Sequence, residues 1–289
     1  MIEIFHISDL HFGSKTIGTK NLLNKIKNEY KIGDVANRYL LITGDITDSG
    51  TKQQYDLAQK NLAAFKDFVY IVPGNHDYEG LGILYAAKSA KRFDSTLSQK
   101  LGVNHGFFPK KPYYKVLDDK AGNRVLIIGL NSCSKVPFIF DLSEGVIGES
   151  QRLELKKILD SREYSETPKI VFLHHVPHKR SVGIGMRLRD YKELMDIVKN
   201  KVDAISFGHT GAMEDIDENE MKKMKLSGRD RIKLETAKKR AIPGRELKLR
   251  SGKGQGIRYY LDANKSIEDQ ACYNIKIEGN KVSAKLKKF

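Results

Sequence analysis

Residues 41–50 read Leu-Ile-Thr-Gly-Asp-Ile-Thr-Asp-Ser-Gly and place a polar loop directly after an apolar run. The run 39–43 is apolar and β-branched, and its length suits a buried strand. Gly44 then interrupts the pattern, and Asp45 and Asp48 follow within five residues. Carboxylates directly after a strand are typical of α/β proteins, which bind ligands at the carboxyl ends of their strands.

Five further runs have the same strand-like composition, and amphipathic segments separate them. This alternation predicts a layered α/β domain. The runs are 2–7, 68–72, 124–130, 169–173 and 204–207. Apolar residues at helical spacing are Leu22, Leu23, Ile26 and Tyr30, then Leu155, Ile158 and Leu159, then Leu188, Tyr191, Leu194, Met195 and Val198. Alternation around Gly279-Asn280 predicts a β-hairpin over about 271–287.

Composition excludes several classes of protein. With 289 residues and 40% apolar content the chain can build a substantial core, so wholesale disorder is excluded. No apolar run approaches the ~18 residues that cross a bilayer, and the N-terminus has no signal-peptide layout, so we expect a cytoplasmic protein without a membrane partner. The two cysteines, Cys133 and Cys272, are expected to be inert core thiols.

One segment interrupts the expected single domain of residues 1–289. Residues 214–220 hold five acidic side chains, and 221–253 then hold thirteen basic against three acidic residues, a local charge of +10 within a total of +15. Its glycines favour an exposed insertion over about 212–256. Charge runs are commonly solvated surface, but this one is also suited to binding nucleic acid.

Polar clusters stand directly after five of the predicted strands. They bring together carboxylates, an amide oxygen and imidazoles without a thiolate, a set suited to Mn, Fe, Zn, Co or Ni. Glycines beside them allow tight turns. The clusters are Asp9-Leu10-His11, Gly44-Asp45-Ile46-Thr47-Asp48, Gly74-Asn75-His76-Asp77, His174-His175 and Gly208-His209-Thr210-Gly211.

In order and spacing these clusters resemble the motifs of the calcineurin-like metallophosphoesterase superfamily: D-x-H, G-D-x-x-D/N, G-N-H-D/E, H and G-H-x-H. The resemblance covers residues 1 to about 211. Within it, 41–50 with Tyr55, and 72–77, look like the class III cyclic-nucleotide phosphodiesterase branch. The superfamily resemblance implies a β-sandwich flanked by helices, a dinuclear metal centre at the strand ends, and phosphoester hydrolysis.

The resemblance also implies a role for each matched residue. His76 would stabilise the transition state or protonate the leaving oxygen, Asp77 would orient His76 through its other ring nitrogen, and Asp48 would buttress the loop. Of the adjacent histidines, we expect His174 to be the ligand and His175 to point elsewhere. The expected metal ligands are Asp9 and His11 for the first ion, Asp45 as the bridge, and Asn75, His174 and His209 for the second.

The chain departs from the superfamily at Gly211, where the last motif otherwise ends in histidine. The first metal would therefore lose a nitrogen ligand. Water could complete that site, which Mn or Mg tolerates better than Zn, or Asp215, Glu214 or His178 could replace the ligand, or the site could be weakly occupied. We expect two divalent ions, with Mn favoured.

Other polar and aromatic residues have weaker signals. His178, Lys179 and Arg180 suit recognition of a substrate phosphate, although an exposed loop is the simpler interpretation. His6 lies within a predicted strand and is expected to be a core histidine. The tyrosine pairs at 113–114 and 259–260 could stack on a base, or simply pack.

Three functions follow. The leading hypothesis is a phosphodiesterase that acts on a nucleotide-type diester, with a cyclic nucleotide as first candidate and a metal-bridging hydroxide as nucleophile. The second is a nuclease of the same superfamily, favoured by the basic segment. The third is a non-catalytic phosphate-ligand binder with a weakened metal site, for which Gly211 is the only support.

Overall fold

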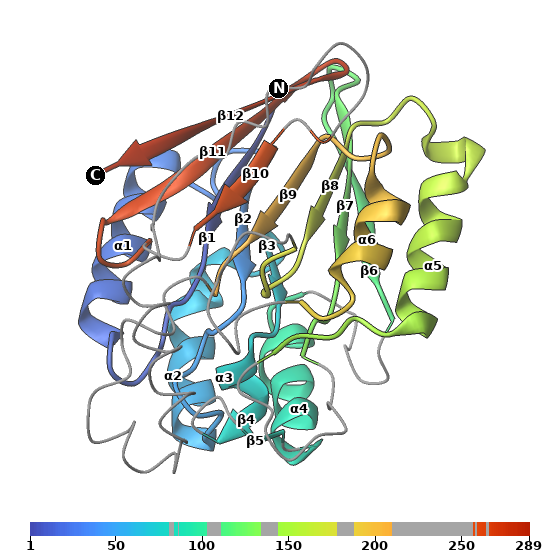
Figure 1. Cartoon of the computed structure of the whole chain (residues 1–289). Helices are drawn as coiled ribbons and strands as arrows, with labels where there is room; N and C mark the ends of the chain where they lie inside the picture. Colours follow the sequence, from blue (N-terminus) through green and yellow to red (C-terminus); the bar gives the residue numbers. More distant parts are fainter. Residues whose placement is uncertain are drawn as a thin grey trace.

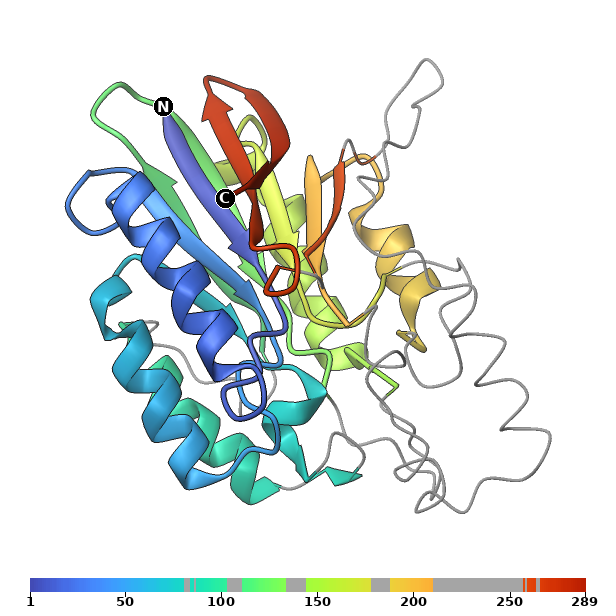
Figure 2. The same ribbon diagram turned by 90° about the vertical axis from the view of Figure 1, so that its left-hand side faces the viewer.

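The computed structural model describes residues 1–80, 84–85, 87–102, 111–133, 144–177, 188–209, 257, 259–263 and 266–289. Two five-stranded sheets pack face to face, and helices cover the outer face of each sheet (Figures 1 and 2). The arrangement is the helix-flanked α/β sandwich that the sequence predicted.

The first sheet contains the strands nearest the N-terminus and the C-terminal hairpin, in the order β12-β11-β1-β2-β3. The strands β1, β2 and β3 run parallel, while β11 pairs antiparallel with both β1 and β12. Their bounds are β1 Ile2–Ile7, β2 Arg38–Thr43, β3 Val69–Val72, β11 Ala271–Glu278 and β12 Lys281–Lys288. The predicted hairpin is thus present, and it extends this sheet.

The second sheet has the order β10-β9-β8-β7-β6, in which only β6 is antiparallel to its neighbour. The strands are β6 Tyr113–Asp118, β7 Arg124–Gly129, β8 Lys169–Phe172, β9 Ala204–Phe207 and β10 Tyr259–Asp262. The sequence pattern did not predict β6 and β10, which contain the two tyrosine pairs. Tyr113 stacks on Tyr70 of β3 with ring centroids 6.0 Å apart, and Tyr260 is buried, so these two rings serve the core.

Helices lie in the connections between strands, and three of them, over residues 16–30, 149–160 and 191–198, fall where the periodicity predicted a helical face. The α-helices are α1 Thr16–Tyr30, α2 Lys52–Leu62, α3 Asn75–Tyr78, α4 Ala87–Phe93, α5 Glu149–Asp160 and α6 Tyr191–Val198. Short elements are η1 Ala63–Phe65, η2 Asp94–Ser98, η3 Arg162–Tyr164 and the two-residue strands β4 Glu79–Gly80 and β5 Leu84–Tyr85. Within the described residues, no helix combines the length and the apolar character that spanning a bilayer requires.

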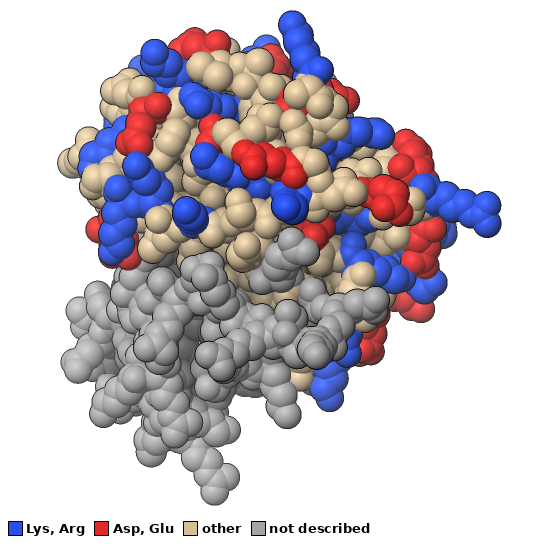
Figure 3. All heavy atoms as spheres, turned by 90° about the horizontal axis from the view of Figure 1, so that it is seen from above, with Lys and Arg blue, Asp and Glu red and all other residues tan. Residues whose placement is uncertain are grey.

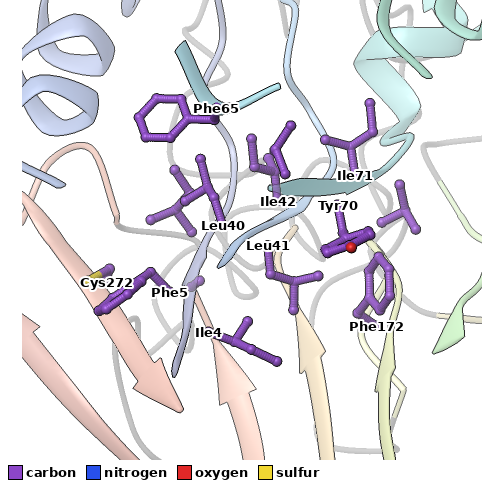
Figure 4. Packing of buried hydrophobic residues seen from close by; sticks show 14 of the residues in the cluster. Ile4, Phe5, Leu40, Leu41, Ile42, Phe65, Tyr70, Ile71, Phe172 and Cys272 are labelled. Atoms are coloured by element: carbon purple, nitrogen blue, oxygen red, sulfur yellow. The ribbon is translucent and has the colours of Figure 1, made fainter. Parts of the chain in front are cut away.

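The main core lies on both faces of the first sheet. Ile4 and Leu41 point toward Phe172 of the second sheet, whereas Phe5 and Leu40 point to the opposite side (Figure 4). On that opposite side Phe5 stacks on Tyr30 of α1, with ring centroids 3.9 Å apart. Each such fully buried side chain contributes about 1.5–3 kcal/mol.

The second sheet is also buried on both faces. Val125 and Ile127 belong to the main core, while Leu126 and Ile128 pack with Leu155 of α5 in a second cluster. Strands buried on both sides explain the nearly continuous apolar runs in the sequence. Both sheets are therefore fixed from two sides, which holds the loops at their ends in place.

Both cysteines are buried, as expected, and neither forms a disulfide within the described part of the chain. Burial raises the pKa of Cys272 to about 12, so its thiol stays protonated and unreactive at neutral pH.

Candidate metal centre

Six polar side chains follow the carboxyl ends of five strands, β1, β2 and β3 of the first sheet and β8 and β9 of the second. Each of the six is at least nine-tenths buried: Asp9, His11, Asp45, Asn75, His174 and His209. Two groups of ligand atoms, each within 4.8 Å, comprise Asp9, His11 and Asp45, and Asp45, His174 and His209. Asp45 is common to both groups, in the place expected of a bridging ligand.

Four of the six residues have a left-handed backbone. The φ angles are 56° at Asp9, 44° at His11, 48° at Asp45 and 68° at His209. This region is uncommon for residues other than glycine, and outliers of this kind cluster at functional sites. Each turn redirects the chain at the end of a strand, so that the side chain points into the space between the two sheets' loops.

Three glycines permit the close approach of these loops. A Cβ on Gly44 would lie 2.6 Å from His174 Nδ1, one on Gly74 would lie 2.1 Å from Asp45 Oδ1, and one on Gly208 would lie 2.4 Å from Asp9 Oδ2. Real Cβ atoms essentially never come within 3.0 Å of another group. The glycines of the sequence motifs are therefore needed because each lies directly against a ligand.

His174 is held in one tautomer. Its Nδ1 donates to the carbonyl oxygen of Thr43 at 2.7 Å. Because a carbonyl oxygen only accepts, the neutral ring carries its proton on Nδ1 and presents a lone pair at Nε2. That Nε2 lies 3.0 Å from Asn75 Oδ1, 3.0 Å from His209 Nδ1 and 3.3 Å from Asp45 Oδ2. Oxygen and nitrogen lone pairs thus converge on one point.

The environment of the buried Asp45 Oδ2 indicates whether the six side chains suit a cation. Among the described residues this oxygen has no hydrogen-bond partner, although Nε2 of His11 lies 4.0 Å away and Nε2 of His174 lies 3.3 Å away. A buried carboxylate oxygen is costly unless a positive charge or a hydrogen bond compensates it. The residues therefore fit divalent cations, with this oxygen as an atom that two ions can share.

The pKa shifts of the buried groups also indicate that positive charge stabilises this site. Burial by itself lowers the pKa of His174, but the carboxylates of Asp45 and Asp9 outweigh it and raise that pKa to about 9. Burial raises the pKa of Asp45, but the neighbouring histidines, His174 first, hold it well below its usual value. Without a metal, a proton on His174 supplies part of the charge that the site requires.

His11 is oriented in a different way. Its Nδ1 lies 3.0 Å from Asp48 Oδ1, which leaves Nε2 on the side of Asp45. Burial opposes a charge on this ring, yet Asp48 and then Asp45 and Asp9 raise its pKa. Asp9 accepts a hydrogen bond from the backbone N–H of His209 at 3.3 Å. This bond joins the loop after β1 to the loop after β9.

His76 lies beside the two groups and is only partly buried. Its backbone N–H donates to Asp45 Oδ1 at 3.0 Å, and its Nδ1 donates to the carbonyl oxygen of Asp48 at 2.6 Å. Its ring meets that of His11 edge-on, with centroids 5.0 Å apart. A partly exposed ring next to the expected ligands is compatible with the role on substrate that the resemblance implies for His76.

The expected contact between Asp77 and the ring of His76 is wrong. The Asp77 carboxylate instead accepts from the backbone N–H of Ile46 at 3.1 Å, of Thr47 at 2.8 Å and of Gly74 at 3.0 Å, and from Thr47 Oγ1 at 2.9 Å. These four hydrogen bonds hold the Asp77 carboxylate against the loops after β2 and β3 rather than against the His76 ring. Burial, followed by the nearby charge of Asp45, raises the Asp77 pKa to about 6.

The ring of His175, the histidine not chosen as a ligand, has a partner outside the two ligand groups. Its Nδ1 lies 2.8 Å from Ser132 Oγ, and its ring packs on that of His209 with centroids 4.5 Å apart. Sequence analysis did not select Ser132. The signal was nevertheless present, because Asn131-Ser132 directly follows a predicted strand in the same layout as the five clusters.

His6 lies in the core, as expected. Its Nε2 is 2.9 Å from Thr43 Oγ1, and its buried Nδ1 has no hydrogen-bond partner among the described residues. Burial lowers the pKa of His6 to about 3, so the ring is neutral. The proposed substrate residues His178, Lys179 and Arg180, the departure at Gly211 and the basic segment 221–253 lie outside the described residues.

A family model described as calcineurin-like phosphoesterase matches residues 2–213. Among curated proteins, the probable glycerophosphodiester phosphodiesterase GpdQ of Arcobacter nitrofigilis is 27% identical over 198 residues, which are 66% of this chain and 62% of the relative. The chain thus spans less than two thirds of that relative's length.

Among solved structures, a dimetal phosphatase from Danio rerio is similar with a TM-score of 0.63 and 12% identity, over 100% of this chain and 99% of that chain. At this identity the similarity is one of fold.

Proposed function

This chain belongs to the calcineurin-like phosphoesterase family, and we propose that it is a metal-dependent phosphodiesterase acting on a nucleotide-type diester. The observation that carries the proposal is the pair of ligand groups that share Asp45, whose buried Oδ2 has no hydrogen-bond partner in the part of the chain that the structure describes. A dinuclear site of this kind is suited to in-line displacement at phosphorus.

Asp9, His11 and Asp45 are the proposed ligands of one ion, and Asp45, Asn75, His174 and His209 those of the other. When bound, two divalent ions polarise phosphate oxygens and make a hydroxide nucleophile available near neutral pH. The set contains only oxygen and nitrogen, and Mn suits it, particularly where a nitrogen ligand is missing at Gly211.

His76 is the proposed residue that acts on substrate. With Nδ1 donating to the Asp48 carbonyl, Nε2 is the ring atom left to face a substrate oxygen. When Nε2 is protonated as well, it can donate to a developing negative charge or give its proton to the leaving oxygen. Asp77 serves this arrangement indirectly, because it ties the loop after β2 to the loop after β3, and these loops contain Asp45 and His76.

The preference for a diester over a monoester is supported by the printed activity of the relative GpdQ, a probable phosphodiesterase. That name also makes a glycerophosphodiester a second candidate substrate beside a cyclic nucleotide. The nuclease alternative is supported by the +10 charge of residues 221–253. A non-catalytic binder, the remaining alternative, predicts no turnover of any diester.

A substrate panel with Mn-loaded full-length protein separates these functions. The panel comprises bis(p-nitrophenyl) phosphate, p-nitrophenyl phosphate, cyclic AMP, glycerophosphocholine, RNA and single-stranded DNA, each with and without chelator. We expect chelator-sensitive turnover of diesters, with the monoester slower by about tenfold or more. Faster hydrolysis of the monoester would overturn the diesterase assignment, and no turnover of any substrate would favour the binder.

A further inference from the structure

Asp48 contacts both His11, an expected metal ligand, and His76, the residue expected to act on substrate. The carboxylate faces His11, with Oδ1 3.0 Å from Nδ1, while the backbone carbonyl oxygen of the same residue accepts from Nδ1 of His76 at 2.6 Å. From this geometry we infer that Asp48 is a positioning residue that sets the affinity of the first metal site. The inference rests on the proposed dinuclear centre.

The Asp48 carboxylate is held from several sides. Oδ1 also accepts from Ser14 Oγ at 3.0 Å, and Oδ2 accepts from the backbone N–H of Ser14. The position of the Asp48 carboxylate requires a glycine at residue 13, because a Cβ there would lie 2.4 Å from Asp48 Oδ2 and 2.8 Å from Gln54 Nε2. A carboxylate fixed in this way determines where the His11 ring points.

The consequence for His11 follows from hydrogen-bond chemistry. A carboxylate accepts, so Nδ1 of His11 carries a proton and Nε2 keeps its lone pair on the side of Asp45, 4.0 Å from Oδ2. Acidic partners of this kind fix the tautomer and orientation of metal-binding histidines, and their loss costs about 10–100-fold in metal affinity. Because the sequence has Gly211 in place of a further histidine, we infer that the first site depends on His11 more strongly.

The contact with His76 differs because it uses the main chain. Removal of the Asp48 side chain therefore leaves an acceptor for Nδ1 of His76 in place. The two contacts can thus be separated by mutation. Asp48→Ala removes the support of His11 and retains that of His76, so the variant should recover most of its turnover once Mn²⁺ is saturating.

The test is a titration of Mn²⁺ into the full-length apo protein, followed by isothermal calorimetry and by electron paramagnetic resonance, which separates single from paired Mn²⁺ ions. We expect Asp48→Ala to weaken one of two sites by about 10–100-fold and to leave the other unchanged. Asp48→Asn should fall between Asp48→Ala and wild type, because its amide oxygen can still accept from His11. Asp56→Ala is the control, since Asp56 is an exposed carboxylate of α2 that pairs with Lys52.

Two outcomes overturn the inference. The first is wild-type affinity at both sites in Asp48→Ala. The second is a loss of affinity at both sites together with a lower melting temperature of the apo protein, which is what a merely structural role predicts. A wild-type protein that binds fewer than two Mn²⁺ ions would instead overturn the dinuclear proposal on which the inference rests.

Discussion

At the scale of single residues, the buried carboxylates of the centre cost free energy, and a bound cation would offset that cost. Asp9 and Asp45 are both buried, and no described residue forms a hydrogen bond with Asp45 Oδ2. Burial, the largest influence, raises the pKa of Asp9, since nothing around it fully compensates a carboxylate. Such a site is typical of function rather than stability, because taking carboxylates and imidazoles out of water costs free energy that apolar side chains of similar size would not require.

His76→Ala separates catalysis from metal binding. Because the His76 ring contacts Asp48 and packs on His11 but belongs to neither ligand group, its removal should leave two metals bound. The turnover rate should fall by roughly 10²-fold or more, the usual contribution of a general acid. Metal analysis and steady-state kinetics on the same preparation check this, and a parallel loss of metal would place His76 among the ligands.

Metal binding should depend on pH through His174. Its pKa of about 9 in the metal-free protein means that an ion must displace a proton at neutral pH. Below that pKa the apparent affinity should rise by up to about tenfold per pH unit as the competing proton is lost, and it should level off near pH 9. Titrations of Mn²⁺ from about pH 6.5 to about pH 8.5 measure this slope. A flat profile would show that His174 is already unprotonated or is not a ligand.

At the scale of elements, the site depends on close packing between the loops that follow neighbouring strands. The Gly74 loop after β3 lies so close to the loop after β2 that a Cβ would fall 2.1 Å from Asp45 Oδ1 and 2.2 Å from its backbone nitrogen. The backbone of Gly74, after β3, therefore packs directly against Asp45, the expected ligand after β2.

Gly74→Ala should consequently destabilise the protein by about 1–3 kcal/mol or more and abolish tight metal binding, because Asp45 must move. Gly122→Ala is the matched control: the φ of Gly122 is +81°, and no atom of the described residues lies within 4 Å of the added Cβ. It should cost only the backbone strain of about 1–2 kcal/mol and leave metal binding intact. Chemical denaturation and metal titration of both variants measure the difference. Equal metal binding in the two would refute the steric argument.

The sequence was most informative about elements with strong periodicity. The six predicted strands and the hairpin are present, because strands buried on both faces leave continuous apolar runs. The edge strands β6 and β10 were missed, since their tyrosines also suit ligand contacts. Asp77 was assigned the wrong partner, because its four hydrogen bonds come from loops that only the folded chain brings together.

At the scale of the whole molecule, charge bears on the choice of substrate. On the face shown in Figure 3, Lys and Arg are interspersed with Asp and Glu rather than gathered into one basic region. Paired surface charges of this kind, such as Lys287 with Glu29 and Lys288 with Asp269, give little attraction to a polyanion. The excess of +10 in residues 221–253, outside the described residues, is therefore the feature that the nuclease alternative depends on.

Neutralisation of Lys238, Lys239 and Arg240 together tests that alternative. If the enzyme acts on nucleic acid, the triple variant should bind RNA and single-stranded DNA more weakly and with a flatter salt dependence, because fewer counterions are released. Hydrolysis of bis(p-nitrophenyl) phosphate should stay nearly unchanged. Anisotropy at several salt concentrations is the measurement. No affinity of the wild type for nucleic acid even at low salt would leave the small-diester function as the one supported.

The central claim is a dinuclear centre bridged by Asp45, and the most direct measurement compares metal content and turnover in wild type and Asp45→Ala. The wild type should contain two ions per chain by mass spectrometry and hydrolyse bis(p-nitrophenyl) phosphate in a chelator-sensitive reaction. Asp45→Ala removes the oxygen common to both groups, so it should lose at least one ion and reduce turnover by about 10³-fold or more. Retention of two ions and wild-type turnover in Asp45→Ala would contradict the account.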